Sequence, residues 1–242
     1  MKKILISAAC FLIINYSFAQ TVFISKAKIE FERKVNMWAN IKGDFSDQIK
    51  KAIPQFKTDY FNFEFDGKQS IYKPGKEVNV KSGFFGGTPA SDNIVFTNYN
   101  TGKFVAQKTV FEKTFLLQDS LRNAKWKITN DFREIAGFNC RRATTIIMDS
   151  VFVVAFYTDE IMIPGGPESF GNLPGMILGL VINRVHTTWY ATKVELTGVN
   201  ANAITPPTKG NKTSVAELNK TLKTSFSNWG NNADIFAWWV ML

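Results

Sequence analysis

Two apolar stretches, Val151–Phe156 (VFVVAF) and Met176–Ile182 (MILGLVI), decide how this chain folds. Neither stretch alternates apolar with polar residues, as a strand with one wet face does. A short run that is apolar throughout is typical of a strand covered on both faces. We therefore expect two buried strands whose inner side is covered by a helix, a second sheet or a cavity that holds an apolar ligand.

The sequence around these two stretches predicts more antiparallel strands. Residues 27–35 alternate for most of their length, and residues 56–65 place Phe61, Phe63 and Phe65 at every second position before an Asp66-Gly67 turn. Further strands are expected over residues 69–72, 94–99, 103–109, 111–118, 126–129, 133–135, 140–148, 151–158 and, as the last one, 185–196. The expected fold class is mainly β (α+β), with a curved antiparallel sheet that closes at most into a half-open barrel.

One or two short helices are expected beside the sheet. Residues 47–53 form a short helix that Pro54 stops, and the capping box Ser214–Glu217 opens a helix that runs to about Asn228. Residues 236–242 are almost entirely apolar. They either pack on the sheet as a tail or form an exposed contact for a membrane or a partner.

The N-terminal residues have the pattern of a signal peptide. Lys2 and Lys3 precede the apolar residues 4–14, and the small residues Ser17 and Ala19 fit cleavage after Ala19. The apolar segment is shorter than the roughly 20 residues that a membrane-spanning helix needs, so we expect no transmembrane span. Residues 20–242 are then expected to form a single domain that is exported to the periplasm or associated with the outer membrane.

Composition narrows the possible functions. The net charge is +9, but the basic residues are spread along the chain and do not alternate with aromatic residues as in a nucleic-acid groove. We therefore expect no nucleic-acid partner. Of the two cysteines, Cys10 lies in the predicted signal peptide, so Cys140 has no partner for an intramolecular disulfide. The 22 phenylalanines fit a large core or an apolar cavity.

Few residues have the pattern of a catalytic or metal site. His186 is the only histidine, which leaves too few ligands for the usual zinc site, and the Gly-x-Ser-x-Gly elbow of a serine hydrolase is missing from the sequence. A thiol hydrolase built on Cys140 and His186 is a third alternative, although Cys140 follows a turn and has the pattern of a core residue. Glu168 is the best lone carboxylate, with a surface position as its simpler interpretation. We expect no catalytic residue, no metal and no cofactor.

Residues 126–178 carry the most distinctive motifs of the chain. These are a Gly-x-x-Cys turn at 137–140, a Thr-x-Glu-Ile segment at 158–161, a Gly-Pro pair at 166–167 and Leu173-Pro174-Gly175 followed by an apolar run. In this combination the chain resembles the GLPGLI family of exported Bacteroidetes proteins. Phe156 stands where that family usually has Trp, and Met176 stands where it usually has Leu. The resemblance implies a cell-envelope location and supplies no established activity.

The prolines and glycines of residues 164–175 predict a corner of defined shape, because proline fixes φ and glycine permits conformations that other residues avoid. This corner is either purely structural or the mouth of a binding site. The candidate binding residues are Pro164, Gly166, Pro167, Glu168, Phe170, Leu173, Pro174 and Gly175. Phe84 and Phe85, in the Gly-rich loop 74–91, are candidates for a lid.

The sequence thus predicts a non-catalytic envelope protein that binds a hydrophobic small molecule or a peptide. The alternative is an accessory or structural partner of an outer-membrane protein complex, docked through Leu173–Gly175 or through the apolar C-terminal residues.

Overall fold

The computed structural model describes residues 24–39, 41, 43–76, 89–110, 112–227 and 231–242. The predicted signal peptide, residues 1–19, and the predicted lid residues Phe84 and Phe85 lie outside this part of the chain. All structural statements below concern the described residues.

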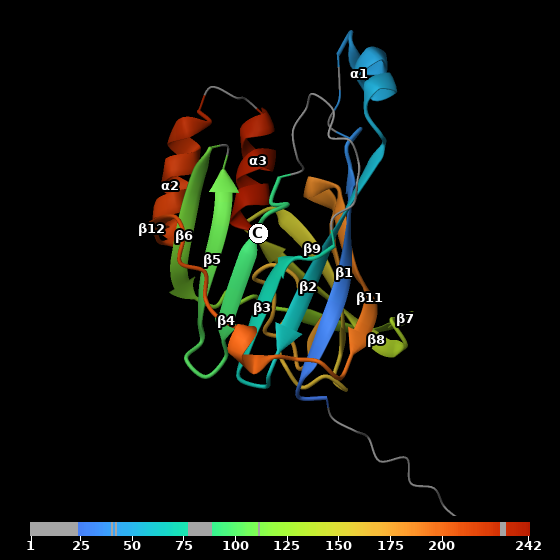
Figure 1. Ribbon diagram of the computed structural model, residues 1–242. Coiled ribbons are helices and arrows are strands. Elements are labelled where there is room, and N and C mark those ends of the chain that lie inside the picture. The colour runs from blue at the N-terminus through green and yellow to red at the C-terminus, as the bar shows by residue number, and fades with distance from the viewer. Residues whose placement is uncertain (1–23, 40, 42, 77–88, 111, 228–230) are drawn as a thin grey trace, which may run out of the picture.

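A single curved sheet of 12 strands forms the framework of the molecule (Figure 1). Its strands are β1 (Ala27–Asn36), β2 (Phe56–Phe65), β3 (Gln69–Pro74), β4 (Ile94–Asn98), β5 (Lys103–Val110), β6 (Lys113–Ser120), β7 (Lys127–Ile135), β8 (Phe138–Ile147), β9 (Val151–Thr158), β10 (Met176–Ile182), β11 (Thr187–Glu195) and β12 (Asn211–Thr213). They lie in the order β12-β6-β5-β4-β3-β2-β1-β11-β10-β9-β8-β7. All neighbouring strands are antiparallel except β12, which runs parallel to β6.

This strand order divides the sheet into two meanders. Strands β1 to β6 pair one after the other, and so do strands β7 to β11. The two meanders join only where β1 pairs with β11, from Lys28 opposite Glu195 to Val35 opposite Thr187. The sheet stays open, with β12 and β7 as its edge strands.

Three α-helices accompany the sheet: α1 (Ser46–Ala52), α2 (Val215–Ser225) and α3 (Asn231–Met241). Short 3₁₀ turns, η1 (Asn183–Val185) and η2 (Ala201–Ala203), follow β10 and β11. Helices α2 and α3 lie side by side next to β5 and β6, whereas α1 projects at the upper right of the picture (Figure 1). The predicted fold class is confirmed, with three short helices in place of one or two.

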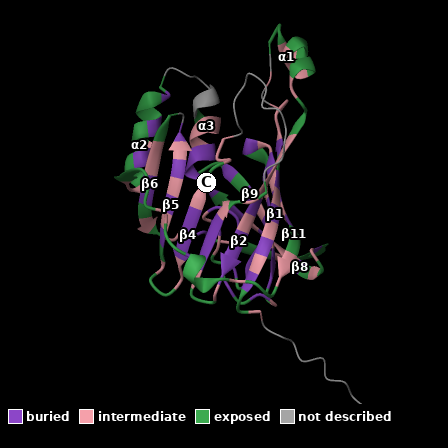
Figure 2. Ribbon diagram, viewed as in Figure 1, coloured by how far each residue is buried: buried purple, intermediate pink, exposed green. Residues whose placement is uncertain are grey.

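Buried and partly exposed residues alternate along strands of the sheet (Figure 2), and the buried set forms the core. On β1, Ile29, Phe31 and Val35 are buried while their neighbours are partly exposed, and the phenylalanines of β2 continue the same layer. This is the two-residue period that the sequence of these strands predicts.

The two apolar stretches that predict buried strands behave differently. In β10, Ile177, Leu178 and Leu180 are all buried, as expected. In β9 the prediction is wrong, because its side chains alternate and Phe152 is 43% exposed.

The outer face of β10 is covered by the bent end of β7. A Cβ atom on Gly179 would lie only 2.8 Å from Ile135 Cδ1, and Arg133 reaches across to donate a hydrogen bond to the Tyr190 hydroxyl at 2.9 Å. This cover does not extend to the start of β9, where Phe152 pairs with the exposed Ile146 of β8. An apolar run alone therefore did not determine which strand is covered twice.

The C-terminal third differs from expectation in three places. The strand predicted over residues 185–196 begins only at Thr187, after η1, and it is not the last, because β12 follows. The predicted capping box of Ser214 and Glu217 is present, but α2 ends at Ser225. The apolar terminal residues form the helix α3, and Trp239 to Leu242 are buried. Within the described chain, none of the helices has the length and apolar character needed to cross a bilayer.

Candidate functional site

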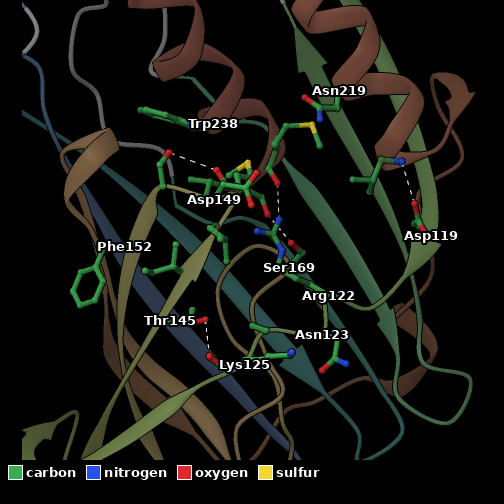
Figure 3. Close-up of a pocket in the computed structure, with 18 of the residues that line it drawn as sticks. Asp119, Arg122, Asn123, Lys125, Thr145, Asp149, Phe152, Ser169, Asn219 and Trp238 are labelled. Atoms are coloured by element: carbon green, nitrogen blue, oxygen red, sulfur yellow. Dashed lines mark hydrogen bonds between the residues drawn. The ribbon is translucent and has the colours of Figure 1, made fainter.

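A cleft of about 1130 Å³ opens between the two meanders (Figure 3). Strands β5 and β6 contribute one wall, and β8 with the start of β9 contributes the other. Helices α2 and α3 and the linker between β6 and β7, residues 121–126, complete it. The volume is slightly above the usual range of ligand-binding clefts, about 300–1,000 Å³.

Three polar side chains, Lys108, Arg122 and Ser169, form the floor of this cleft and donate hydrogen bonds to the end of α3. Lys108 donates a hydrogen bond to the Val240 carbonyl at 3.0 Å, and Arg122 donates to the Met241 carbonyl at 2.7 Å. Ser169 donates to the Leu242 carbonyl oxygen at 2.6 Å. The last turn of a helix leaves its carbonyls without partners inside the helix, and these contacts satisfy three carbonyls at that end.

Burial makes both basic side chains of the cleft floor easier to deprotonate. It lowers the pKa of Lys108 to about 8 and that of Arg122 to about 10. For Lys108 the negative charge of Glu168 opposes this effect. Burial removes water from the charged form, so a lysine here is partly neutral a little above physiological pH.

The rest of the lining mixes apolar and charged groups. Phe104, Leu117 and Ile147 face the cleft as apolar side chains. Five basic residues and three acidic residues also line it: Lys108, Arg122, Lys125, Lys127, Lys223, Asp119, Asp149 and Asp234. One carboxylate oxygen of Asp119 accepts a hydrogen bond from the backbone N–H of Val215 at the start of α2. The lining thus has more basic than acidic residues.

Behind the floor, Arg33 connects α3 to the centre of the sheet. Its guanidinium is fully buried, pairs with Asp59 at 2.5 Å and lies between the rings of Phe61 and Trp239, at 5.0 and 5.5 Å from their centroids. It also donates hydrogen bonds to the carbonyls of residues 89 and 90, which follow the 77–88 segment. Trp239 is thereby fixed in the core, and with it the end of α3 at the cleft.

The predicted corner, residues 164–175, lies on the concave side of the sheet and covers the inner face of β10. The backbone N–H of Ile177 donates to the Gly165 carbonyl at 2.9 Å. A Cβ atom on Gly166 would lie 2.8 Å from Ile177 Cβ, and one on Gly175 would lie 2.0 Å from the Thr158 carbonyl oxygen. Both glycines are therefore required by close packing, and the corner is the element that covers β10 from within.

The candidate binding residues of the corner do not all share one surface. Pro164, Gly166, Glu168 and Phe170 line a small hollow of about 250 Å³ together with Tyr99 and Arg122. Gly175 is enclosed by backbone, Pro167 and Leu173 are buried, and Pro174 is exposed away from that lining.

Glu168 is only 3% exposed, so a surface position for this carboxylate is wrong. It has a left-handed backbone, with φ of 55°, and one carboxylate oxygen accepts a hydrogen bond from Asn93 Nδ2 at 2.8 Å. Burial and, after it, the charge of Glu168 raise the pKa of Tyr72. The corner thus places the Glu168 carboxyl group in the interior, where it influences the pKa of both Lys108 and Tyr72.

The two residues of the thiol alternative lie on separate parts of the sheet. Cys140 is buried on β8, and burial raises its thiol pKa to about 12. His186 follows η1 in a left-handed conformation, just before β11, and strands β9 and β10 stand between β8 and β11. A thiol with a raised pKa is a poor source of thiolate at neutral pH, and this arrangement provides no activated nucleophile.

A second hollow, called the side hollow below, adjoins the cleft. It measures about 540 Å³ and is lined by Phe152, Asn183, Arg184, His186, Asp234, Ile235 and Trp238. Phe152, Asp234 and Trp238 also line the cleft, so the two spaces are continuous. Sequence reasoning missed the side hollow, because its residues come from β9, η1 and α3 and no local pattern connects them.

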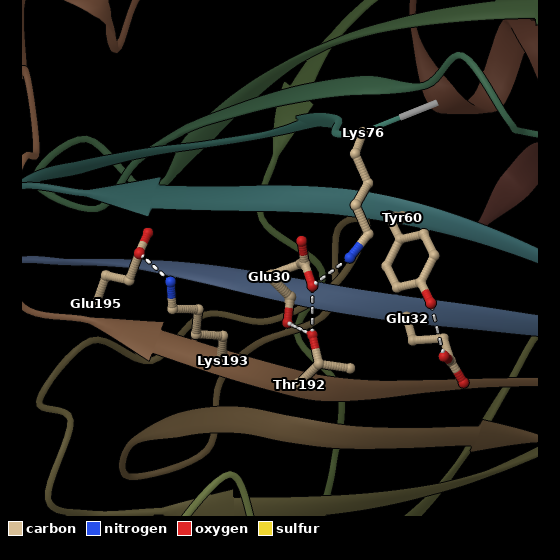
Figure 4. Close-up of polar contacts among 7 residues, drawn as sticks. All are labelled: Glu30, Glu32, Tyr60, Lys76, Thr192, Lys193 and Glu195. Carbon is tan, nitrogen blue, oxygen red and sulfur yellow. Dashed lines mark hydrogen bonds and ion pairs between the residues drawn. The ribbon is translucent and has the colours of Figure 1, made fainter. Parts of the chain in front are cut away.

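The convex face of the sheet offers a different surface. Glu30 accepts hydrogen bonds from Lys76 at 3.0 Å and Thr192 at 2.8 Å, and the Tyr60 hydroxyl donates to Glu32 at 3.1 Å (Figure 4). These side chains satisfy one another across β2, β1 and β11, as cross-strand pairs on a solvated sheet face commonly do. The cleft and the side hollow are therefore the better candidates for binding.

Comparisons with known proteins place this geometry in a family. Residues 89–219 match the family described as N-glycanase peptide, N-terminal domain. No curated protein matches the chain. Two solved structures of PNGF-II are similar to it, in space groups C2 and P21, with TM-scores of 0.53 and 0.54.

Both structures are 14% identical to this chain, and each match covers 81% of it. The chain spans about a third of their length, with coverages of 32% and 33%. The similarity to the solved structures supports the fold alone, whereas the family match covers more than half of the sequence. This chain belongs to the family of N-glycanase N-terminal domains.

Proposed function

We propose that this chain is a non-catalytic binding domain of the bacterial envelope and that it holds an extended peptide segment in the cleft. The observation that carries the proposal is the cleft itself, which is open, about 1130 Å³ in volume and lined by both apolar and charged side chains. An apolar lining with a few placed polar groups is what ligand sites share.

The charge of the cleft lining should determine which peptides bind. The lining contains more basic than acidic residues, and Lys125, Lys127 and Lys223 are exposed there. Complementary charge speeds association and suppresses wrong partners. We therefore expect a peptide that combines apolar with acidic residues to bind better than one that combines apolar with basic residues.

A binding role is compatible with the family match. The matched family is described as the N-terminal domain of an N-glycanase, and this chain covers about a third of the length of the solved PNGF-II structure. A domain that presents a substrate to another part of such a protein would need a cleft and no catalytic residues. Export to the periplasm or outer membrane, and membership of the GLPGLI family, stay predictions from the sequence.

The test is fluorescence anisotropy of a labelled decapeptide that alternates leucine and glutamate, with a leucine–lysine decapeptide for comparison. We expect the acidic peptide alone to bind. The double variant Lys125→Glu with Lys127→Glu should weaken its binding by about tenfold or more, since two attractive charges become repulsive.

The matched control is Lys212→Glu with Lys220→Glu, which makes the same change in net charge at exposed positions outside the cleft. It should leave the dissociation constant within about twofold, because exposed distant charges are screened by salt. Equal weakening in both double variants, or failure of the acidic peptide to bind the folded protein, would rule out the cleft as its site.

A hydrophobic small molecule is the second candidate ligand, favoured by the apolar side chains of Phe104, Leu117 and Ile147 in the same cleft. Its binding should be insensitive to the Lys125 and Lys127 variants. Native mass spectrometry of the purified protein distinguishes the two, since a small apolar ligand would be retained at a defined mass.

Exposed apolar side chains on two strands favour the docking alternative, whereas the burial of the terminal residues does not. Ile146 and Phe132 are 64% and 58% exposed on β8 and β7 and could contact an outer-membrane partner. Trp239 to Leu242 are buried, so these residues cannot serve as the exposed docking surface that the sequence left open.

A further inference from the structure

The small hollow beside the corner contains a buried carboxyl group with a hydrogen-bond partner on only one of its oxygens. Glu168 lines this hollow, which measures about 250 Å³, and is 3% exposed. Its Oε2 atom accepts a hydrogen bond from Asn93, whereas the buried Oε1 atom accepts none from the described residues. A buried acceptor without a donor costs free energy and is rare in native proteins. The Oε1 atom therefore indicates a donor that a bound molecule supplies.

A basic group lines the same hollow. Arg122 is partly exposed there and donates a hydrogen bond to the Met241 carbonyl. A guanidinium has five N–H donors, so this contact does not exhaust it. Among the described residues, Arg122 and Glu168 form no ion pair with each other or with a third residue. The hollow thus presents an acidic and a basic group that are not paired with each other.

The remaining wall of the small hollow is largely apolar. Its apolar side chains are Phe63, Val95, Leu121 and Phe170. A water molecule could donate to Glu168 Oε1, but it brings neither a negative group for Arg122 nor an apolar group for this wall. A molecule that carries an ammonium group, a carboxylate and an apolar side chain matches all three parts of the lining.

The walls of the small hollow are held in place before any ligand binds. Trp126 Nε1 donates to the Gly171 carbonyl at 2.9 Å, and Asn172 Nδ2 donates to Asn123 Oδ1 at 3.1 Å. A Cβ atom on Gly171 would lie 2.3 Å from the Pro164 carbonyl oxygen, so the corner is closely packed here. A site that is fixed in advance loses little conformational entropy on binding.

We propose that the small hollow binds a free α-amino acid with an apolar side chain, whose ammonium group donates to Glu168 and whose carboxylate accepts from Arg122. The volume of about 250 Å³ suits a ligand of this size, because it lies just below the range of about 300–1,000 Å³ that is usual for larger ligands. The inference goes beyond the proposed function and does not depend on what the cleft binds.

The first test changes the ligand and leaves the protein as it is. Isothermal titration calorimetry compares L-leucine with N-acetyl-L-leucine, which lacks the ammonium group, and with L-leucinamide, which lacks the carboxylate. The titrations use the chain from residue 20 onward. We expect L-leucine to bind, and each derivative to bind about tenfold more weakly or worse, because each leaves one charged group of the hollow without its partner.

The second test changes the carboxyl group. Glu168→Gln keeps the size of the side chain and can still accept a hydrogen bond from Asn93, but it removes the negative charge. It should weaken the binding of L-leucine by about tenfold or more. The affinity for N-acetyl-L-leucine should change by less than about twofold, because that ligand has no ammonium group to lose a contact.

The matched control is Glu64→Gln, the same chemical change at another buried carboxyl group. Glu64 pairs with Lys73 at 3.6 Å and lies outside the lining of the small hollow. This variant should bind L-leucine as the unchanged protein does. Circular dichroism of both variants verifies that each is folded.

Equal affinity for the three ligands, undiminished binding of L-leucine to Glu168→Gln, or no binding of L-leucine to the folded protein would overturn the amino-acid site. The decapeptide assay tests the cleft separately. If the acidic decapeptide binds and L-leucine does not, only this inference falls. If L-leucine binds as expected and the decapeptide does not, only the proposed function falls.

Discussion

Trp238 and Trp239 are neighbours on α3, yet they belong to two different regions of the molecule. Trp239 is 4% exposed, contacts Trp189 and stacks on the buried Arg33. Trp238 is half-buried and shares the wall of the cleft and the side hollow with Phe152. The contacts of Trp239 in the core fix α3. The neighbouring Trp238 side chain is thereby held at the wall of the cleft. The comparison predicts that stability and binding are carried by adjacent residues and can be separated.

The largest effect is expected from Trp239→Ala. Removal of a buried indole leaves a cavity and exposes Arg33, so the free energy of unfolding should fall by about 3–5 kcal/mol. Urea denaturation followed by circular dichroism measures the change. A loss below about 1 kcal/mol would mean that the core tolerates the gap and that the packed region does not depend on α3.

The next effect is expected from Arg33→Met, which leaves Asp59 without its buried partner. Loss of one member of a buried pair should cost about 3 kcal/mol of unfolding free energy. Arg142→Met is the control, because Arg142 pairs with Asp131 at the surface, where such pairs contribute about 1 kcal/mol or less. Equal losses in the two variants would contradict the special role of the interior pair.

Lys108 should produce a smaller, pH-dependent effect. Its pKa in the folded protein is about 8, below the ordinary value of 10.5, so between these values the unfolded chain binds more protons than the folded one. Stability from this group therefore rises with pH above about 8, by about 1 kcal/mol between pH 7 and pH 9. Lys108→Met should lack this rise, and the difference between the two proteins isolates it from other titrating groups.

The smallest stability effect is expected from Trp238→Ala, about 1 kcal/mol or less, because the ring is half-buried at the surface. Thermal unfolding of this variant beside Trp239→Ala makes the comparison direct. If Trp238→Ala destabilised the protein as much as Trp239→Ala, the separation of stability from binding on α3 would be contradicted.

Local patterns predicted most strands, because alternation and turn residues act over a few positions. The period-two phenylalanines of β2 and the capping box of α2 are both present as expected. The same alternation could also have located the interior charges. Arg33 follows Ile29 and Phe31, and Lys108 follows Phe104 and Ala106, each at inward positions of its strand.

The candidate sites depended on contacts that the sequence does not express locally. Which apolar strand is covered twice depends on the bend of β7 over Gly179 and on the corner beneath β10. The cleft exists because two meanders curve toward each other, and its floor joins Lys108 to Val240 across the sequence. Arg33 and Lys108 contact the end of α3 from distant parts of the sequence, so no local pattern predicted how the apolar terminal residues pack.

The join between the two meanders has a consequence for how the protein reaches its native state. Each meander is built from neighbouring hairpins, but the ladder between β1 and β11 pairs residues that are more than 150 positions apart. Closing so long a loop is slow, and until it closes both strands present unpaired edges. We expect the two halves to gain hairpin structure first and to unite late, with self-association in that interval as the main competitor of folding.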